Sequence, residues 1–226
     1  MPQDKINNLN EPTLRSGFTK CILNAQQLCL EAKLLHENEM YARSYSLSHF
    51  AREELAKSLM LYRALGEKAA GRQVNWKRLN RRFRDHKQKI INDRLISVML
   101  LADDDSDEKI SDHLKGIEFT NNRKNQCLYV DWEQNDFVMP EEKITKELSD
   151  RNLKLATYRI AAFSKIFEKL LEAINHSTEI IENSPDLQAF YNSPNDSKTM
   201  LVETFLDTNI SRLSALSKAI NKELFD

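Results

Sequence analysis

The chain of 226 residues contains few of the residues that form tight turns, with only 4 Gly and 5 Pro. A β-sandwich needs many turns rich in these residues, so the composition argues against that class and favours helices. Three cysteines, Cys21, Cys29 and Cys127, are odd in number and lack CxxC spacing, so we expect neither a disulfide framework nor a zinc site. No run of eighteen apolar residues is present, and segment 1–11 is polar, so we expect neither a membrane span nor a signal peptide.

Motifs that bind cofactors are also missing from the sequence. It has no Glu-x-x-His, no HExxH, no Gly-rich phosphate loop and no GxSxG. We therefore expect no metal and no other cofactor. The unpaired cysteines indicate a reducing compartment, so the expected location is cytoplasmic.

The apolar spacing of amphipathic helices is what the sequence does contain. A stripe at intervals of three and four predicts a first helix over 11–36, formed by Phe18, Cys21, Ala25, Leu28, Ala32 and Leu35. A second helix is expected over 39–65, with Gly66 and Gly71 at its end. Asn75 is a suitable N-cap for a third helix that runs to 101, and this helix would turn His86 toward the bundle.

The helical periodicity lapses from 102 to 139. This stretch holds an acidic run, a short helical turn over 113–119 and an extended piece over 127–132. Pro140 then opens the longest helix, which is expected to run to 174. Two Ser-Pro pairs follow, and a last amphipathic helix is predicted over 198–224.

The predicted fold is therefore all-α. It consists of a four-helix up-and-down bundle over residues 1–176, with an irregular insertion before the fourth helix. A C-terminal helical extension over 177–226 would pack on the bundle or serve oligomerisation.

Charge is distributed unevenly along the chain, although its net value is only -1. Segment 72–94 holds nine Lys or Arg residues and two acids, whereas 103–112 holds six acids and one Lys. The first segment could follow an anionic backbone, and the second could not. The alternative is that both are solvated surfaces of helices or loops.

The most informative polar residues lie on two helical segments: Glu53, Glu54 and Lys57 on 47–57, and His86, Lys87 and Lys89 on 83–89. Charged groups within apolar helical seams need an explanation, because burying them unpaired costs several kcal/mol. A surface pair of Glu53 with Lys57, and a hydrogen-bonded core histidine at position 86, would explain them structurally. Alternatively, an imidazole beside cations could transfer a proton near a phosphate that those cations hold.

These segments resemble the AbiV group of bacterial abortive-infection proteins, which belongs to the HEPN superfamily. The resemblance rests on SYSLSHFAREELAK, FRDHKQK and KNQCLYVDW, which carry the family's EExxK, HKxK and LYVD elements in order. Asn24 and Ala25 on the first helix also fit. The resemblance covers about residues 12 to 175.

The resemblance implies a HEPN bundle, usually dimeric, that defends against bacteriophage by shutting down translation in the infected cell. Many HEPN proteins are metal-independent ribonucleases with an Arg-x(4–6)-His motif, whose Arg holds the phosphate and whose His acts on the 2′-hydroxyl or the leaving oxygen. Arg81 to His86 fits the four-residue version of the motif, with Arg82 at the position where a polar residue commonly follows the arginine. Arg43 to His49 is a second match.

We therefore expect an RNA-directed effector in which His86 is a general acid or base. Arg81 or Lys87 would stabilise charge on the phosphate, and Glu54 with Lys57 would orient the imidazole. Which of Glu53 and Glu54 faces the site is left open, because the helix phase is uncertain by about a residue. The further candidate RNA-binding residues are Arg78, Arg82, Arg84, Lys89, Arg123 and Lys124.

The expected partners are RNA, including tRNA or ribosome-associated RNA, a phage protein as activator, and a second copy of the chain in a homodimer. The alternative is a HEPN module that has lost catalysis, and that blocks translation or senses a phage protein by contact alone.

Overall fold

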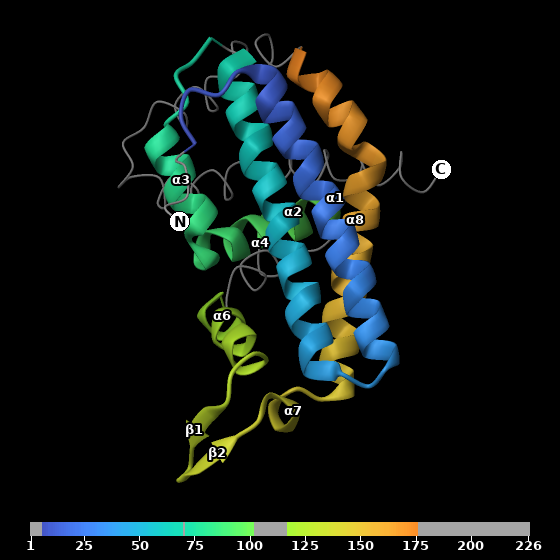
Figure 1. The fold of residues 1–226 in the computed structure, drawn as a ribbon. Coiled ribbons are helices and arrows are strands. Elements are labelled where there is room, and N and C mark those ends of the chain that lie inside the picture. Colours follow the sequence, from blue (N-terminus) through green and yellow to red (C-terminus); the bar gives the residue numbers. More distant parts are fainter. Residues whose placement is uncertain (1–5, 70, 102–116, 176–226) are drawn as a thin grey trace.

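Three long helices that lie side by side form the body of the fold (Figure 1): α1 (Glu11–Glu37), α2 (Tyr41–Ala69) and α8 (Lys146–Asn175). The computed structural model describes residues 6–69, 71–101 and 117–175. Seven helices and one small two-stranded sheet occur in these ranges, which confirms the predicted all-α class.

The core lies where α1, α2 and α8 meet. The buried stripe of α1 consists of Leu14, Phe18, Ile22, Ala25, Cys29 and Ala32, close to the predicted spacing. The ring of Phe18 lies 6.2 Å from that of Phe163 on α8 and 6.1 Å from that of Tyr62 on α2. A Cβ at Gly17 would come within 3.2 Å of Leu61, so this glycine allows α1 and α2 to approach closely.

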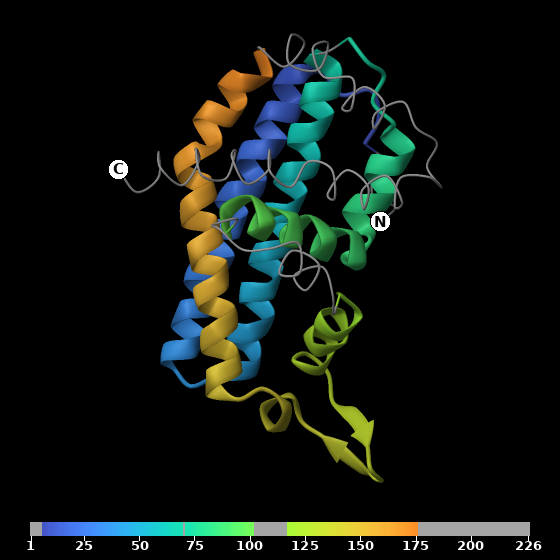
Figure 2. The ribbon, with the colours of Figure 1, turned by 180° about the vertical axis from the view of Figure 1, so that it is seen from behind.

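The predicted third helix is wrong in one respect, because the chain forms two helices there. These are α3 (Trp76–Arg84) and α4 (His86–Leu101), and α4 crosses α2 and α8 at a steep angle (Figure 2). Asp85 separates them, with φ -83° and ψ 110°. Its backbone N–H donates to the carbonyl of Arg81, and its carboxylate accepts from the N–H of Gln88. Asp85 therefore ends α3 and caps the start of α4.

A small polar unit projects from one end of the bundle. It comprises α6 (Ile117–Gln126), β1 (Asp131–Glu133), β2 (Asp136–Val138) and α7 (Pro140–Lys143). The strands pair antiparallel through a two-residue turn whose residues, Gln134 and Asn135, both have positive φ. Of the predicted extended piece over 127–132, only Asp131 and Trp132 belong to a strand, and residues 127–129 form a turn after α6. Trp132 and Phe137 are exposed on it, with ring centroids 4.8 Å apart.

Two predicted helix boundaries also need correction. The helix that opens at Pro140 ends after one turn, because Ile144 is extended and buried, and α8 begins only at Lys146. Gly66 lies inside α2, whereas Gly71, with φ +66°, follows the end of that helix. The predicted helix over 198–224, the proposed extension 177–226 and the acidic run over 103–112 lie outside the described residues.

Candidate functional site

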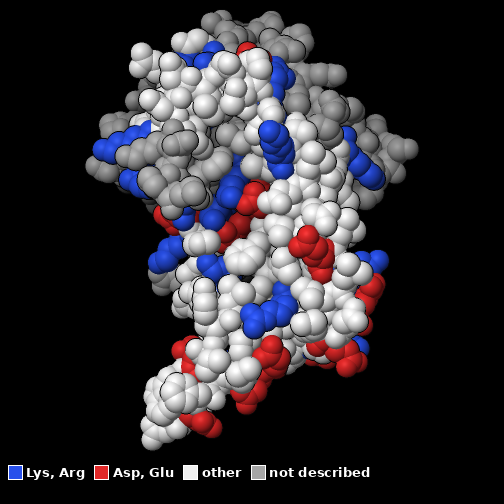
Figure 3. Space-filling view, viewed as in Figure 1, with Lys and Arg blue, Asp and Glu red and all other residues white. Residues whose placement is uncertain are grey.

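Three consecutive residues of α2, Arg52, Glu53 and Glu54, point in three directions because each step along an α-helix turns by about 100°. Arg52 meets Asp93 on α4, Glu53 meets His86 and Lys89 on α4, and Glu54 pairs with Lys57 on its own helix. The three residues therefore belong to three separate polar clusters. Figure 3 shows basic and acidic atoms meeting around a hollow in the middle of one face.

The Glu53 centre comprises Glu53 and the side chains around its carboxylate, His49, His86 and Lys89. Nδ1 of His86 lies 2.8 Å from Oε1 and 2.9 Å from Oε2, and Nζ of Lys89 lies 2.6 Å from Oε2. Nε2 of His49 lies 3.3 Å from Oε1 but forms no well-aligned hydrogen bond. The carboxylate itself is buried, with 4% of the residue exposed. One buried anion thus holds an ammonium group and two imidazoles.

Electrostatics keep the Glu53 carboxylate ionised. Burial alone would raise its pKa, but His49 and Lys89 outweigh burial and hold the pKa well below its ordinary value. Burial lowers the pKa of His49, although the neighbouring Glu53 opposes this effect. The pKa of Lys124 on α6 is also lowered, mainly by burial, although Glu53 opposes the effect. A charged carboxylate accepts but cannot donate, so Nδ1 of His86 carries the hydrogen.

His86 is the one member of the Glu53 centre that reaches the surface, with 45% of its side chain exposed. It is the first residue of α4, and the cap by Asp85 fixes its backbone. Its predicted direction, toward the bundle, holds only for Nδ1, because α4 begins at His86 and does not continue the axis of α3. With Nδ1 donating to Glu53, Nε2 is the nitrogen that a substrate can reach, the arrangement used by catalytic histidines.

Glu54 and Lys57, predicted to orient the imidazole, form an ion pair with each other instead. Their charges act on Cys21 of α1, whose pKa rises to about 11, mainly through burial and then through Glu54. The pair thus faces α1, whereas Glu53 holds His86. This arrangement resolves the ambiguity between the two glutamates in favour of Glu53.

The arginines of α3 divide between two faces of that short helix. Arg81 and Arg84 are exposed and line a hollow of about 680 Å³ with Trp76 and Asn80. Arg78 and Arg82 line a second, smaller pocket with residues of α2. The candidate RNA-binding arginines of α3 therefore do not share one face of the helix. Lys87, the residue after His86, is exposed.

Two of the predicted RNA-binding lysines are buried. Lys89 is 5% exposed and bound to Glu53, and Lys124 is likewise 5% exposed. The ammonium group of Lys89 therefore lies in the interior beside the Glu53 carboxylate. Arg123, also on α6, is partly exposed. The histidine of the second Arg-x(5)-His match, His49, lies in the Glu53 centre, while its arginine, Arg43, donates to the carbonyl of Leu128.

The sequence analysis missed a buried cluster, the Asp93 network, in which Asp93 accepts from Arg52 and Arg159. Nε of Arg52 lies 3.1 Å from the Asp93 carboxylate, and Nη1 of Arg52 donates to Asn152 at 2.6 Å. Asn152 in turn donates to Ser48. Asp93 lies at helical spacing between buried Ile90 and Ile96, and Arg159 between buried Ala156 and Phe163, which is the signal that could have revealed the network.

Within the described ranges, no group of three or more His, Cys, Asp or Glu side chains could hold a metal ion. A bilayer-spanning helix, sufficiently long and apolar, is likewise not found among those residues.

Comparison with protein-family models gives a match to the AbiV family model of HEPN proteins over residues 13–161. The matched range includes α1, α2 and the Glu53 centre, and it ends within α8. Searches against curated proteins and against solved structures gave no match.

Proposed function

Because the chain belongs to the AbiV family of HEPN proteins, which suggests a role in abortive infection, we propose that it shuts down translation in infected cells as a metal-independent endoribonuclease. The observation that carries the proposal is the pairing of buried Glu53 with exposed His86. A carboxylate that fixes one imidazole nitrogen leaves the other poised for proton transfer.

The chemistry assigned to His86 is cleavage of RNA through its own 2′-hydroxyl. His86 Nε2 takes the proton of that hydroxyl while the 2′-oxygen bonds to phosphorus. The bond from phosphorus to the 5′-oxygen breaks, and the leaving oxygen takes up a proton from water. Glu53 holds the ring in the required tautomer and stabilises the imidazolium that forms. The groups of the protein that take part in this reaction are side chains.

Exposed cations on either side of His86 would hold the RNA backbone. Arg81 and Arg84 end α3, and Lys87 follows His86 on α4. Guanidinium and ammonium groups at such positions neutralise phosphates without reading sequence. RNA as substrate, a phage protein as activator and a homodimer that joins two such surfaces remain predictions of this proposal.

The test is incubation of the purified full chain with tRNA and with total RNA in the presence of a metal chelator. Wild-type protein should cleave, and His86→Ala should lose about 10²-fold to 10⁴-fold of the rate, the usual contribution of a general acid or base. Glu53→Gln should also lose activity, because the amide no longer fixes the charged ring. The readout is the initial rate of product formation on denaturing gels.

Glu54→Gln is the matched control, since it makes the same chemical change at the neighbouring position. Glu54 pairs with Lys57 rather than His86, so this variant should retain cleavage. Circular dichroism would confirm that all variants are folded. Intact RNA with wild-type protein, or equal rates for wild type and His86→Ala, would remove the ribonuclease proposal.

A second function, translation block by binding alone, is favoured by the position of Arg81. Arg81 is the arginine of the Arg-x(4)-His motif. Among the described residues, no hydrogen bond or ion pair joins it to His86 or Glu53, so Arg81 is not part of the Glu53 centre. The two functions can be separated in cells that express the protein. Toxicity that survives His86→Ala but not Arg81→Glu with Arg84→Glu would favour binding.

A further inference from the structure

Exposed apolar side chains gather on the hairpin of β1 and β2. Trp132 and Phe137, which are cross-strand partners, are 56% and 69% exposed. Tyr129 and Met139, on either side of the two strands, are exposed as well. Contiguous apolar surface of this kind marks an interaction site. We call segment 129–139 the aromatic hairpin.

The aromatic hairpin is acidic. It contains Asp131, Glu133 and Asp136 and no Lys or Arg. Glu133 pairs with Lys143, so the remaining charges are those of Asp131 and Asp136. Each of these two carboxylates accepts from the N–H of the aromatic residue that follows it, at 2.9 Å and 2.8 Å. The acidic groups are therefore fixed beside the rings, and Figure 3 shows the hairpin as uncharged surface with acidic atoms at its edges.

The hollow beside α3, which we call the α3 hollow, has the opposite charge. Lys77, Arg81 and Arg84 line it, together with one carboxylate at the joint after α3. Its apolar wall comes from Ile6 and Trp76, which pack against the core. The volume of about 680 Å³ lies in the range of pockets that enclose drug-sized ligands, so two aromatic side chains can enter it.

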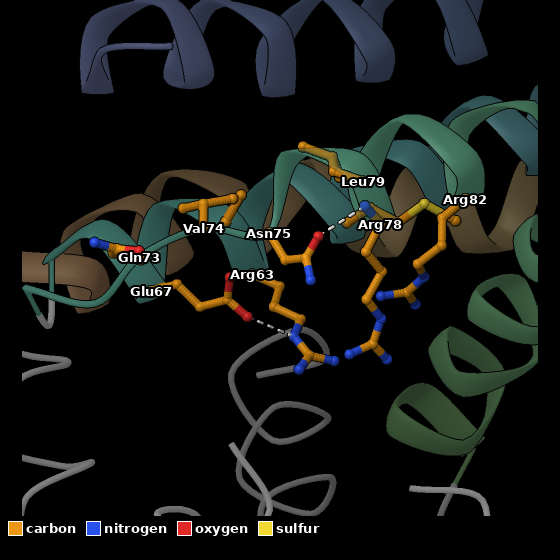
Figure 4. A pocket seen from close by; sticks show the side chains of 10 residues that line it. Arg63, Glu67, Gln73, Val74, Asn75, Arg78, Leu79 and Arg82 are labelled. Carbon is orange, nitrogen blue, oxygen red and sulfur yellow. Dashed lines mark hydrogen bonds and ion pairs between the residues drawn. The ribbon is translucent and has the colours of Figure 1, made fainter. Parts of the chain in front are cut away.

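Hydrogen bonds hold the wall of the α3 hollow in place. The N–H of Ile6 donates to the side chain of Asn80 at 2.9 Å. Asn80 donates in turn to the carbonyl of Ile6, and to that of Trp76 at 2.8 Å. Arg78 and Arg82 lie on a different side of α3, in the smaller pocket beside α2 (Figure 4). The α3 hollow is therefore a preformed site with its own set of cations.

We propose that the aromatic hairpin of one copy of this chain docks into the α3 hollow of a second copy. The two rings pack against the apolar wall, while Asp131 and Asp136 face Arg81 and Arg84. Both arginines are exposed, so they are available to a partner. Complementary charges of this kind select the partner and fix its orientation.

The arrangement of the fold allows two copies to exchange hairpins. Figures 1 and 2 show the hairpin and α3 along the same side of the molecule, with the hairpin at its end and well away from α3. The hairpin therefore does not fill the hollow of its own copy. Two copies placed antiparallel along this side, and related by a two-fold axis, bring each hairpin to the hollow of the other.

The covered area favours this closed dimer over a single contact. An aromatic side chain buries about 150–250 Å² when it is fully covered, and Trp132 and Phe137 are each more than half exposed. Two copies contribute four such rings. With the walls that they cover, these rings approach the lower end of the roughly 1,200–2,000 Å² that stable interfaces bury. One docked hairpin covers only half as much.

A docked hairpin covers Arg81 and Arg84, the arginines to which the proposed function assigns contacts with RNA. Dimer and RNA therefore compete for one surface. This competition rests on the proposed function, whereas the docking itself does not. The homodimer expected with the proposed function joins two basic surfaces, whereas here each basic surface meets an acidic hairpin.

The test is the mass of the full chain in solution, measured by sedimentation over a series of protein concentrations. The wild type should form a dimer. Trp132→Ala with Phe137→Ala should raise the dissociation constant at least tenfold, because buried aromatic residues carry much of the energy of an interface. Leu23→Ala with Leu30→Ala is the matched control, since it removes two similarly exposed apolar side chains from α1. It should leave the dissociation constant unchanged.

An exchange of charges tests the pairing of the two surfaces. Asp131→Lys with Asp136→Lys in the hairpin, and Arg81→Glu with Arg84→Glu in the hollow, should each weaken the dimer, because like charges then meet. An equimolar mixture of these two double variants should recover it, since every hairpin then meets a hollow of opposite charge. Circular dichroism would confirm that all variants are folded.

Several results would overturn the docking. These are a wild type that stays a single copy, a dimer that is unchanged in Trp132→Ala with Phe137→Ala, and a mixture that fails to recover the dimer. If the wild type stays a single copy while Arg81→Glu with Arg84→Glu weakens RNA binding, RNA and not a second copy occupies the α3 hollow.

Fluorescence anisotropy with single-stranded RNA tests the competition. At concentrations where the wild type is a dimer, Trp132→Ala with Phe137→Ala should bind RNA more tightly than the wild type does. Equal affinities would show that the docked hairpin leaves Arg81 and Arg84 uncovered, against the proposed geometry. If no variant binds RNA although the exchange of charges behaves as expected, the proposed function fails and the docking stands.

Discussion

Asp93 lies on α4 between two arginines from different helices, Arg52 of α2 and Arg159 of α8. All three side chains are at most 5% exposed. Burial raises the pKa of the Asp93 carboxyl, but the charges of the two arginines outweigh it and lower the pKa to about 2. Since one carboxylate pairs with cations on two other helices, the loss of its charge affects three helices at once.

We expect Asp93→Asn to lower the free energy of unfolding by about 3–5 kcal/mol at pH 7, because it leaves buried guanidinium groups without a counter-charge. Because its folded-state pKa lies below the ordinary value of 3.8, Asp93 stabilises the fold above about pH 4. This contribution is lost as the pH falls through about 2. Urea unfolding from pH 7 to pH 2 would show the decline in the wild type and a shallower decline in Asp93→Asn.

Asp150→Asn is the control, because Asp150 forms an i,i+4 pair with Lys154 on the surface of α8. The lysine side chain is 76% exposed, so removing this pair should change stability by about 0–1 kcal/mol. If Asp93→Asn and Asp150→Asn lowered the free energy of unfolding equally, the Asp93 network would not stabilise the fold more than a surface ion pair does.

Single residues also show where prediction from sequence ends. The EExxK segment could be placed on a helix, and its importance could be inferred from its charges. Choosing between Glu53 and Glu54 requires the helix phase to within about 100°, and that phase depends on how α2 packs against α1 and α4. Lys89 is a candidate RNA-binding residue from its sequence, but its burial against Glu53 follows from the tertiary fold.

At the scale of elements, the joint at Asp85 sets the position of His86. Asp85→Ala should cost about 1 kcal/mol of stability, because the N–H of Gln88 loses its cap. It should reduce RNA cleavage by more than this small loss implies, since His86 is the first residue of α4 and would be less well fixed. The measurement is the cleavage rate at a temperature where the variant is fully folded.

Asn10→Ala provides the comparison, because Asn10 caps α1 by accepting from the N–H of Thr13 at 2.9 Å. It should lower stability by a similar amount and leave the cleavage rate unchanged. If Asn10→Ala reduced the cleavage rate as much as Asp85→Ala does, the cap at Asp85 would not be what positions His86 for cleavage.

The sequence was sufficient to predict helices and insufficient to predict where they bend. The stripe of α1 and the cap at Asn75 are local signals, and the structure confirms both. The stripe formed by Leu79, Phe83 and Ile90 continues in register across Asp85, so periodicity alone hid the break. An Asp followed three residues later by Gln is a helix-start signal that could have revealed it.

At the scale of the whole molecule, a net charge of -1 conceals distinct charged regions. The basic segment divides between the exposed side chains of Arg81, Arg84 and Lys87 and those of Arg78 and Arg82, which line the smaller pocket beside α2. The hairpin at the far end instead carries Asp131, Glu133 and Asp136 beside its exposed aromatic residues. RNA is therefore expected to contact the α3–α4 region and to avoid the hairpin.

We expect replacement of Arg81 and Arg84 by Glu to weaken binding of single-stranded RNA and to make it less sensitive to salt. Each lost phosphate contact should reduce the slope of log K against log salt concentration by about 0.7. Fluorescence anisotropy over a series of KCl concentrations measures both quantities. Lys33→Glu with Lys154→Glu, on α1 and α8, alters the net charge equally and should leave the slope unchanged. A similar slope for both double variants would contradict the placement of RNA on α3 and α4.

The three directions taken by Arg52, Glu53 and Glu54 have a consequence for how the length of this chain can vary. Insertion or deletion of one residue between Tyr41 and Arg52 would rotate all three side chains by about 100° relative to the helices around them. The Asp93 network and the Glu53 centre would then be lost together, whereas Glu54 and Lys57 would keep their i,i+3 pair but turn away from α1. Changes of length should therefore be tolerated in the turn of the hairpin, where no buried charge depends on the register, and not in the first half of α2.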